Sequence, residues 1–235
     1  MIFMKYPEHW TELQTLTSQL FTELGCSCEV EKEIDIMRGT KKVDVYVEDP
    51  ISNPAMIYLC ECKHWTTRVP KEVVHSFRTV LTDAGGNRGF IISSAGFQSG
   101  AYEAAQNSNV ELVTWKELQE IFAERWINTM QNKLSELGKQ IPIEGEAVFD
   151  KPAPSTKFSD GSAFMQYFFK LACLTAISVD SVSDADFPRT VTDPHGDETK
   201  TATITINSVR EYFDIVLPLA REILDGFKAL QKKNI

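Results

Sequence analysis

The stretch that most constrains the fold is residues 88–94, "RGFIISS", because the centre of this run is entirely apolar. A strand with one exposed face alternates apolar and polar side chains, whereas a strand without a polar side is buried on both faces. Helical spacing of apolar residues precedes it in residues 70–86, and a shorter helical pattern follows in residues 97–108. We therefore expect a central strand buried between layers of helices, as in an α/β fold.

Further segments extend this pattern into a sheet. The other helices are expected at residues 10–24 and 116–137, and the other strands at residues 27–36, 41–49, 54–63 and 110–115. Together these elements predict a mixed sheet flanked by helices. We assign residues 1–138 to this domain.

The remainder of the chain has a different composition. Residues 139–162 are rich in Pro, Gly and Ser and are interpreted as a linker that contains a short strand. Residues 163–235 are expected to form a smaller, mainly helical α+β region, with an exposed loop at 179–200 and a strand at 201–206. Its last helix, from Ser208 to about Lys232, carries an apolar stripe that must cover either its own subdomain or a second subunit.

The strand at 54–63 ends in "YLCECK", in which charged residues alternate with cysteines. Because side chains alternate between the faces of a strand, Glu61 and Lys63 share one face, and Cys60 and Cys62 share the other. The preceding strand carries Asp44 in "KKVDVYV", and pairing of the two strands brings Asp44 close to Glu61.

Two neighbouring carboxylates repel each other unless a cation lies between them. Mg²⁺ prefers oxygen ligands of this kind, lowers the pKa of a bound water, and neutralises charge that develops on a phosphate. Lys63 beside it would orient the attacking water or stabilise the transition state. An ion pair at an exposed strand end is the alternative reading of Glu61 and Lys63.

The cysteines have two readings. Cys26, Cys28, Cys60 and Cys62 could supply thiolates to zinc, but structural zinc sites usually use Cys-x₂₋₄-Cys turns. Within a strand, free cysteines act as small buried hydrophobes, and we favour that reading. Five unevenly spaced cysteines and a start without signal-peptide character indicate a reducing cytoplasm.

Several motifs together resemble the Mrr-like restriction endonuclease domain of the PD-(D/E)xK nuclease superfamily. The motifs are "RGTKKVDVYVED", "ECKHW", "GFIISSAGFQSGAYEAA" and "VELVTWKEL", in the family's order, within about residues 8–122. The resemblance implies a restriction-endonuclease-like fold and metal-dependent hydrolysis of DNA. Val43 stands where the Pro that names the superfamily would be, and His75 and Ser76 stand where many members carry Gln.

The resemblance also implies roles for individual residues. Asp44 and Glu61 would bind Mg²⁺, with Mn²⁺ as an alternative ion, the backbone carbonyl of Cys62 would be a further ligand, and Lys63 would support hydrolysis. An acidic residue on the first helix often completes the family's site. Glu12 fits that place, with Glu23 as the alternative.

A group of basic residues follows or precedes these motifs and is a candidate for phosphate contact. Its members are Lys42, His64, Arg68, Lys71, His75 and Arg78, and Arg38 and Lys41 would extend it. A solvated helix face is the alternative explanation. Trp65 would either stack on a base or close the core. The net charge of −9 argues against a surface coated in positive charge, but not against a local basic groove.

Two functions from different classes remain open. The first is a metal-dependent DNA endonuclease that acts in restriction or defence against phage, as a homodimer or larger assembly with a protein partner for the C-terminal region. The second is a non-catalytic nucleic-acid-binding or regulatory module that keeps the nuclease fold. RNA or branched DNA is an alternative substrate for the first.

Overall fold

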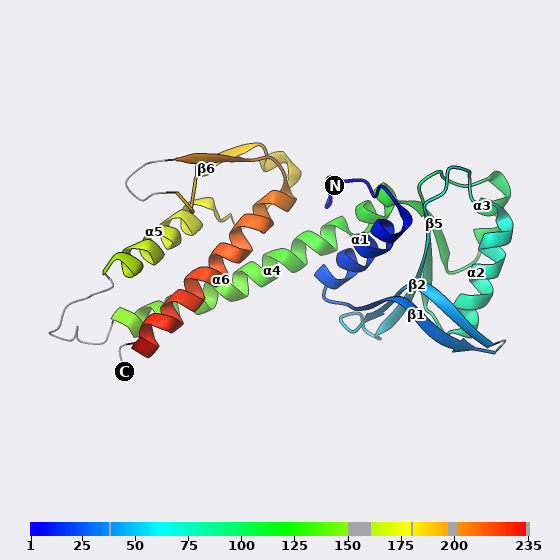
Figure 1. Cartoon of the computed structure of the whole chain (residues 1–235), viewed down its shortest axis with the longest axis horizontal. Coiled ribbons are helices and arrows are strands. Elements are labelled where there is room, and N and C mark those ends of the chain that lie inside the picture. The colour runs from blue at the N-terminus through cyan, green and yellow to red at the C-terminus, as the bar shows by residue number, and fades with distance from the viewer. Residues whose placement is uncertain (38, 150–160, 180, 197–201, 234–235) are drawn as a thin grey trace. The chain divides into compact units, whose positions relative to one another are not determined.

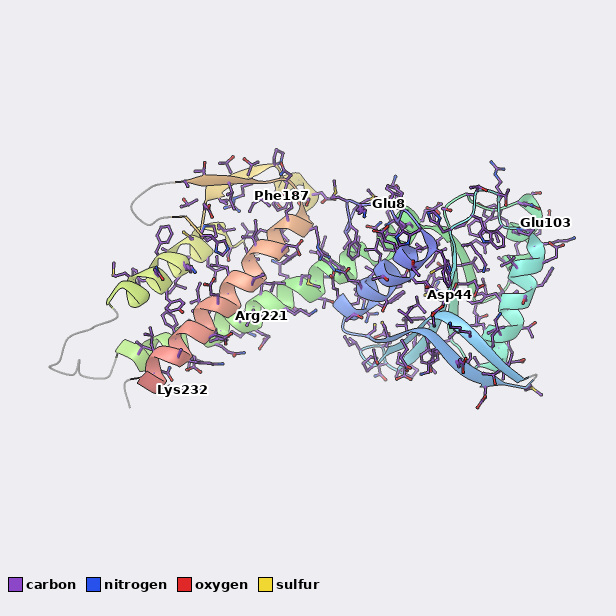
Figure 2. The ribbon with its side chains drawn as sticks, viewed as in Figure 1. Glu8, Asp44, Glu103, Phe187, Arg221 and Lys232 are labelled. Carbon is purple, nitrogen blue, oxygen red and sulfur yellow. The ribbon has the colours of Figure 1, made fainter. Side chains whose placement is uncertain are left out.

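The computed structural model describes residues 1–37, 39–149, 161–179, 181–196 and 202–233. The chain divides into two compact units, Met1–Thr129 and Met130–Ile235. The division lies within helix α4 (Trp115–Phe149) rather than after residue 138. Figure 1 labels the elements, and Figure 2 adds the side chains.

The first unit is an α/β domain with a five-stranded sheet. Besides the start of α4, its elements are α1 (Trp10–Glu23), β1 (Ser27–Ile36), β2 (Gly39–Asp49), β3 (Met56–Lys63), α2 (Lys71–Asp83), β4 (Arg88–Ser93), α3 (Ser99–Ala105) and β5 (Val110–Thr114). The strands lie in the order β1-β2-β3-β4-β5. Pairing is antiparallel from β1 to β3 and parallel from β3 to β5, so the sheet is mixed, as expected.

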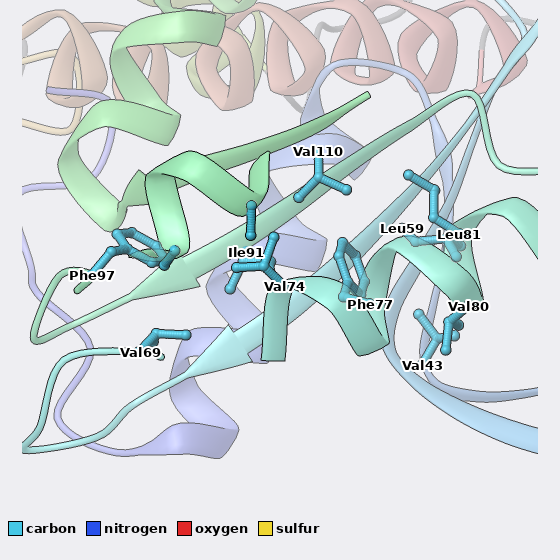
Figure 3. Packing of buried hydrophobic residues seen from close by; sticks show 12 residues of the cluster. Val43, Leu59, Val69, Val74, Phe77, Val80, Leu81, Ile91, Phe97 and Val110 are labelled. Atoms are coloured by element: carbon cyan, nitrogen blue, oxygen red, sulfur yellow. The ribbon is translucent and has the colours of Figure 1, made fainter. Parts of the chain in front are cut away.

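Helices α2 and α3 cover one face of the sheet. On this face Leu59 of β3 and Ile91 of β4 are fully buried in a cluster with Phe77 of α2 (Figure 3). Helix and strand approach closely there, since a Cβ added to Gly89 would lie 2.6 Å from the Phe77 ring. The apolar run that predicted a central strand is thus buried beneath a helix.

Helices α1 and α4 supply the opposite layer. The ring of Phe21 on α1 lies 4.9 Å from that of Phe122 on α4, and Phe90 of β4 contacts both rings. Successive residues of β4 therefore alternate between the two helical layers, and this alternation fixes which face each residue of the neighbouring β3 occupies.

An ion pair ties the end of β2 to α4. Asp49 is fully buried and accepts two hydrogen bonds from the guanidinium of Arg125, at 2.6 and 2.8 Å. Ser52 and Tyr58 donate hydroxyl hydrogen bonds to the same carboxylate. The Asp49 charge is thus compensated on all sides, as a buried carboxylate requires.

The second unit contains the end of α4 and a small α+β arrangement. Its other elements are α5 (Gly161–Ile177), the 3₁₀ turn η1 (Asp184–Asp186), β6 (Arg189–Thr192), β7 (Thr203–Ile206) and α6 (Val209–Lys233). The apolar stripe of α6, including Tyr212, Val216 and Ile223, is buried within this chain. The stripe therefore covers its own subdomain and is not available as the subunit interface considered from the sequence.

Two expectations for this region differ from the structure. Residues 139–149, expected in a linker with a short strand, continue α4 as helix, because Ile141 on its apolar face is buried despite Pro142. Residues 150–160 of the expected linker lie outside the described residues. The expected loop at 179–200 contains β6, which pairs antiparallel with β7. Four residues are too few to reveal a strand by alternation.

No helix in the described parts of the chain is both long enough and apolar enough to cross a membrane.

Candidate active site

Glu61 and Lys63 lie on the face of β3 that is covered by α2. Leu59, Glu61 and Lys63 pair in parallel register with Gly89, Ile91 and Ser93 of β4. Because Leu59 and Ile91 belong to the cluster beneath α2, Glu61 and Lys63 share that side of the sheet. Cys60 and Cys62 are buried on the opposite side, where the Cys62 thiol contacts Thr17 of α1. The separation of the two pairs by face is confirmed.

The two charged side chains form a short ion pair. Lys63 Nζ lies 2.5 Å from Glu61 Oε1, and the side chains are only 16% and 17% exposed. The same ammonium lies 5.3 Å from the centre of the Trp65 ring. Their limited exposure weighs against the alternative of a solvated ion pair at a fraying strand end, because such a pair would be largely exposed.

Asp44 lies where the β2 ladders are interrupted. Pairing of β2 with β3 ends at Val45 and Cys60, and this register places Asp44 opposite Glu61. Toward β1, Asp44 falls in the gap between two paired positions, opposite Glu31, which has a φ of +55°. A non-glycine residue with positive φ is strained, and such strain is commonly found at functional sites.

The distortion also changes the face of the next residue. Val43 belongs to the buried cluster beneath α2, although strict alternation from Val45, whose partner Cys60 faces α1, would direct it away. Val43 and Val45 therefore point to opposite faces of the sheet, although they are two residues apart in one strand. Strand β2 therefore rotates at Asp44. The Asp44 carboxylate lies between β2 and β3, where it accepts a hydrogen bond from the Cys62 amide.

Two hydrogen bonds fix the Asp44 carboxylate. The Cys62 backbone N–H donates to Oδ2 at 2.7 Å, and the Gln14 side-chain amide donates to Oδ1 at 3.1 Å (Figure 2 labels Asp44). Burial raises the pKa of Asp44 and the charge of Glu61 raises it further, while the Cys62 amide opposes both. The raised pKa thus reflects first the burial of the Asp44 carboxylate and second its repulsion by the Glu61 carboxylate.

The first helix contributes Gln14 to this site. Gln14 is 1% exposed and lies on the buried face of α1. Glu12 instead accepts hydrogen bonds from Lys5 Nζ and the Glu8 amide, and these contacts lower its pKa. Residues two apart on a helix face different directions, which explains why Gln14 and not Glu12 contacts Asp44. A buried polar residue on an apolar helix face was the available sequence signal.

Glu23, the alternative to Glu12, lies at the far end of the same helix. It accepts a hydrogen bond from the Trp126 indole at 2.7 Å and another from Gln19. Nine residues of helix separate it from Gln14, a rise of about 13 Å. Glu23 therefore links α1 to α4, away from Asp44.

The proposed nucleic-acid contacts occupy several environments. Arg68, Lys71 and His75 are exposed on the loop after β3 and on α2. Lys42 is exposed and pairs with Glu31 at 2.9 Å, whereas Arg78 donates to the Ala104 carbonyl and so ties α2 to α3. His64 lies 3.2 Å from the Pro7 carbonyl. Arg38 lies outside the described residues.

A cleft of about 280 Å³ opens beside the ion pair. Its polar wall includes Lys41, Glu61 and Lys63, and its apolar floor comes from α2. Trp65 forms another wall and is 41% exposed, so it does not close the core. Glu61 and Lys63 thus face an open cleft that is slightly smaller than the roughly 300–1,000 Å³ of drug-sized pockets.

The donor set suits a hard divalent cation. Asp44 and Glu61 offer carboxylate oxygens, and a cation between them would relieve the repulsion that raises the pKa of Asp44. In the described ranges, no group of three His, Cys, Asp or Glu side chains is arranged to hold a metal. Mg²⁺ is commonly held by one or two carboxylates and keeps several waters, so two carboxylates fit it.

The cysteines of β3 are poor candidates for metal binding. Burial raises the pKa of Cys60 and of Cys62 well above the ordinary value, so both thiols stay protonated. Zinc requires thiolates. Cys60 and Cys62 act as buried hydrophobic side chains on the α1 face.

Comparisons with known proteins agree with this geometry. Residues 8–122 match the Mrr catalytic domain family, described as restriction endonuclease. No curated protein matches the chain. A crystal structure of a protein of unknown function, AF1548, is 12% identical, covers 96% of this chain and 100% of its own, and has a TM-score of 0.41. That likeness is too weak to support an argument.

The matched range contains Asp44, Glu61, Lys63 and Gln14, and it coincides with the sheet and helices of the first unit. Residues 8–122, just under half of the chain, therefore form a domain of the Mrr-like restriction endonuclease family of PD-(D/E)xK nucleases.

Proposed function

We propose that the protein is a metal-dependent endonuclease that hydrolyses phosphodiester bonds in DNA. The observation that carries this proposal is the placement of Asp44 opposite Glu61, with Lys63 bound to Glu61 in an open cleft. A module without chemistry has no need for two repelling carboxylates in a partly buried position. The family match supports a nuclease, and the donor chemistry supports Mg²⁺, with Mn²⁺ as an alternative.

In the proposed mechanism Asp44 and Glu61 would hold the cation, together with the Cys62 carbonyl. A divalent cation bound there would lower the pKa of a water and neutralise charge on the phosphate. Gln14 and the Cys62 amide hold the Asp44 carboxylate in place before substrate arrives. Glu61 in turn restrains the Lys63 ammonium, which donates a hydrogen bond to the attacking water or to the phosphate oxygens.

In this proposal Glu12 supports the start of α1 and is not a metal ligand. It neutralises Lys5 and accepts from the Glu8 amide, so it orders the segment that leads into α1. His64, Arg68, Lys71 and His75 are proposed to contact the DNA backbone, because they follow β3 directly beyond Lys63. Lys42 would extend this surface, while Arg78 serves it indirectly by fixing α2 to α3.

The test is cleavage of supercoiled plasmid and of linear DNA in Mg²⁺, in Mn²⁺ and in chelator. We expect cleavage with either metal and none with chelator. Asp44→Ala and Lys63→Ala should each abolish it, because they remove a metal ligand and the cationic group. RNA and a branched DNA junction of the same sequence serve as competing substrates.

A geometry-matched ion pair in the second unit provides the control. Lys170 Nζ lies 2.5 Å from Glu222 Oε1, the same separation as in the Lys63–Glu61 pair. Lys170→Ala should leave cleavage unchanged. Cleavage that is absent under every metal condition would favour the non-catalytic binding module. Cleavage that survives both Asp44→Ala and Lys63→Ala would show that this site does not carry it.

We further propose a role in restriction or defence against phage in the cytoplasm. Double-strand cleavage by this fold often needs two active sites, so we propose a dimer or larger assembly, with the second unit available for a protein partner. Expression of the protein in a phage-sensitive host should reduce plaque formation, and Asp44→Ala should restore it. Light scattering at several protein concentrations would test the assembly.

A further inference from the structure

The exposed indole of Trp65 lies outside the core, with the Lys63 ammonium 5.3 Å from the centre of its ring. Trp65 is 41% exposed, whereas Trp115 and Trp126 are 3% and 2% exposed in the core. Exposing a tryptophan leaves a large apolar surface in water. The ring instead forms a wall of the cleft that contains Glu61 and Lys63.

The composition of the cleft matches a nucleobase and its phosphate. Its floor is apolar, from Val73, Phe77 and Val80 of α2, and its aromatic wall is Trp65. Lys63 lies 5.3 Å from the centre of the Trp65 ring, so a phosphate at the ammonium would have its adjoining nucleoside beside the indole. Proteins that bind single-stranded nucleic acid combine cationic groups with aromatic stacking surfaces in this way.

We propose that Trp65 stacks on the base next to the scissile phosphate, so that the preferred DNA carries an unpaired nucleotide at the cleavage position. In a paired duplex each base already stacks on its neighbours and is held by its partner. A base that is unpaired costs less to move onto a protein ring. This inference rests on the proposed nuclease function and specifies the substrate class of the same site.

Binding without metal tests the stacking separately from hydrolysis. The probes are one DNA sequence as a single strand, as a paired duplex, and as a duplex with a single bulged nucleotide, with 2-aminopurine at the unpaired position. We expect its fluorescence to be quenched by the protein through stacking. Trp65→Ala should remove the quenching and weaken binding to the bulged duplex about 5- to 150-fold, with little effect on the paired duplex.

Trp10 supplies a matched control because it is 40% exposed but lies at the start of α1, outside the cleft. Trp10→Ala should keep both the quenching and the preference for the bulge. Trp65→Phe retains an aromatic ring and should retain most of the affinity. Thermal unfolding of each variant checks that the fold is intact.

The outcomes separate this inference from the proposed function. If Trp65 acted only by positioning Lys63, Trp65→Ala would slow cleavage but leave the 2-aminopurine signal unchanged, and the stacking proposal would be overturned. Equal binding of paired and bulged duplexes by the unsubstituted protein would also overturn it. Quenching that depends on Trp65 without cleavage in any metal would retain stacking and refute the nuclease function.

Discussion

Gln14 is the residue that connects the first helix to the candidate active site. Its amide donates to Asp44 Oδ1, and its 1% exposure means that no solvent replaces this contact when it is lost. Groups that hold a ligand in place typically change metal affinity or activity about 10- to 100-fold when removed. The helix thus acts on the proposed metal site through one neutral side chain.

We predict that Gln14→Leu lowers the cleavage rate about 10- to 100-fold while the protein stays folded. Leu fills a similar volume but leaves Asp44 Oδ1 without its donor, so the carboxylate loses its fixed orientation. Measurement of cleavage rate against Mg²⁺ concentration should show a higher metal requirement. Gln19→Leu is the control, since Gln19 lies on the same helix and bonds Glu23 instead of Asp44. Equal rates for the two variants would contradict the role of Gln14.

For single residues, the sequence predicted which side chains belong to the candidate site better than it predicted their contacts. Glu61 and Lys63 could be placed on one face because alternation in a strand is a local rule. Gln14 could not be chosen over Glu12 because the choice depends on which side of α1 meets the sheet. The rotation at Asp44 was equally hidden, since it lies opposite Glu31, a residue with positive φ on a different strand.

The elements of the first unit hold the site through a few specific links. Helix α4 is tied to the last residue of β2 through the ion pair of Arg125 with Asp49, five residues beyond the interruption at Asp44 in the middle of the strand. The Arg125 guanidinium lowers the pKa of the Asp49 carboxyl well below its usual range. In the unfolded chain the pKa of the Asp49 carboxyl is about 3.9.

We predict that Asp49→Asn destabilises the protein by about 3 kcal/mol at pH 7, because it leaves Arg125 without its partner. A carboxyl whose pKa is lowered by folding stabilises the protein above its unfolded pKa, and this contribution is lost as pH falls through the folded value. Unfolding by urea at pH 7 and at about pH 3 should therefore show the difference between the two proteins shrinking in acid.

Glu29→Gln provides the comparison for this measurement. Glu29 pairs with Lys32 at 2.6 Å, but its side chain is 59% exposed. An exposed pair contributes less than about 1 kcal/mol, so this variant should unfold close to the unsubstituted protein at both pH values. A large effect of Glu29→Gln, or none of Asp49→Asn, would show that burial does not distinguish the two pairs.

Most elements were predictable because their signals are local and strong. The helices and strands of residues 10–114 followed from apolar spacing, Gly25 and the apolar run at 88–94. The end of α4 was not predictable, because Gly138 and Pro142 are typical of a break in a helix. In the structure, burial of Ile141 by the rest of the second unit favours a continuous helix. Packing of this kind cannot be read from a single segment.

The whole molecule carries a net charge of −9, which is unusual for a protein proposed to bind DNA. Attraction to the phosphates must come from a few exposed cations near the cleft, such as Lys41, Arg68 and Lys71. Binding strength then depends on a local field opposed by the rest of the surface. Affinity for unrelated DNA should be correspondingly low.

We predict that the logarithm of DNA affinity falls with the logarithm of salt concentration with a slope of about −3 to −4, as for roughly four phosphate contacts. Lys71→Ala should reduce the size of the slope by about 0.9. Lys232→Ala, at the exposed end of α6, should leave it unchanged. Fluorescence anisotropy in chelator would measure the three slopes. Equal slopes for all three proteins would remove Lys71 from the phosphate-binding surface.

The hydrogen bond from the Cys62 amide to Asp44 gives the site a built-in reporter. Where a neighbouring strand would normally supply a carbonyl, a carboxylate accepts this proton instead. The exchange rate of that single amide with heavy water therefore depends on the orientation of Asp44. A cation that draws Asp44 away from Cys62 would accelerate exchange, and one that immobilises the carboxylate would slow it. Either way, a single backbone proton records occupancy of the site without any cleavage.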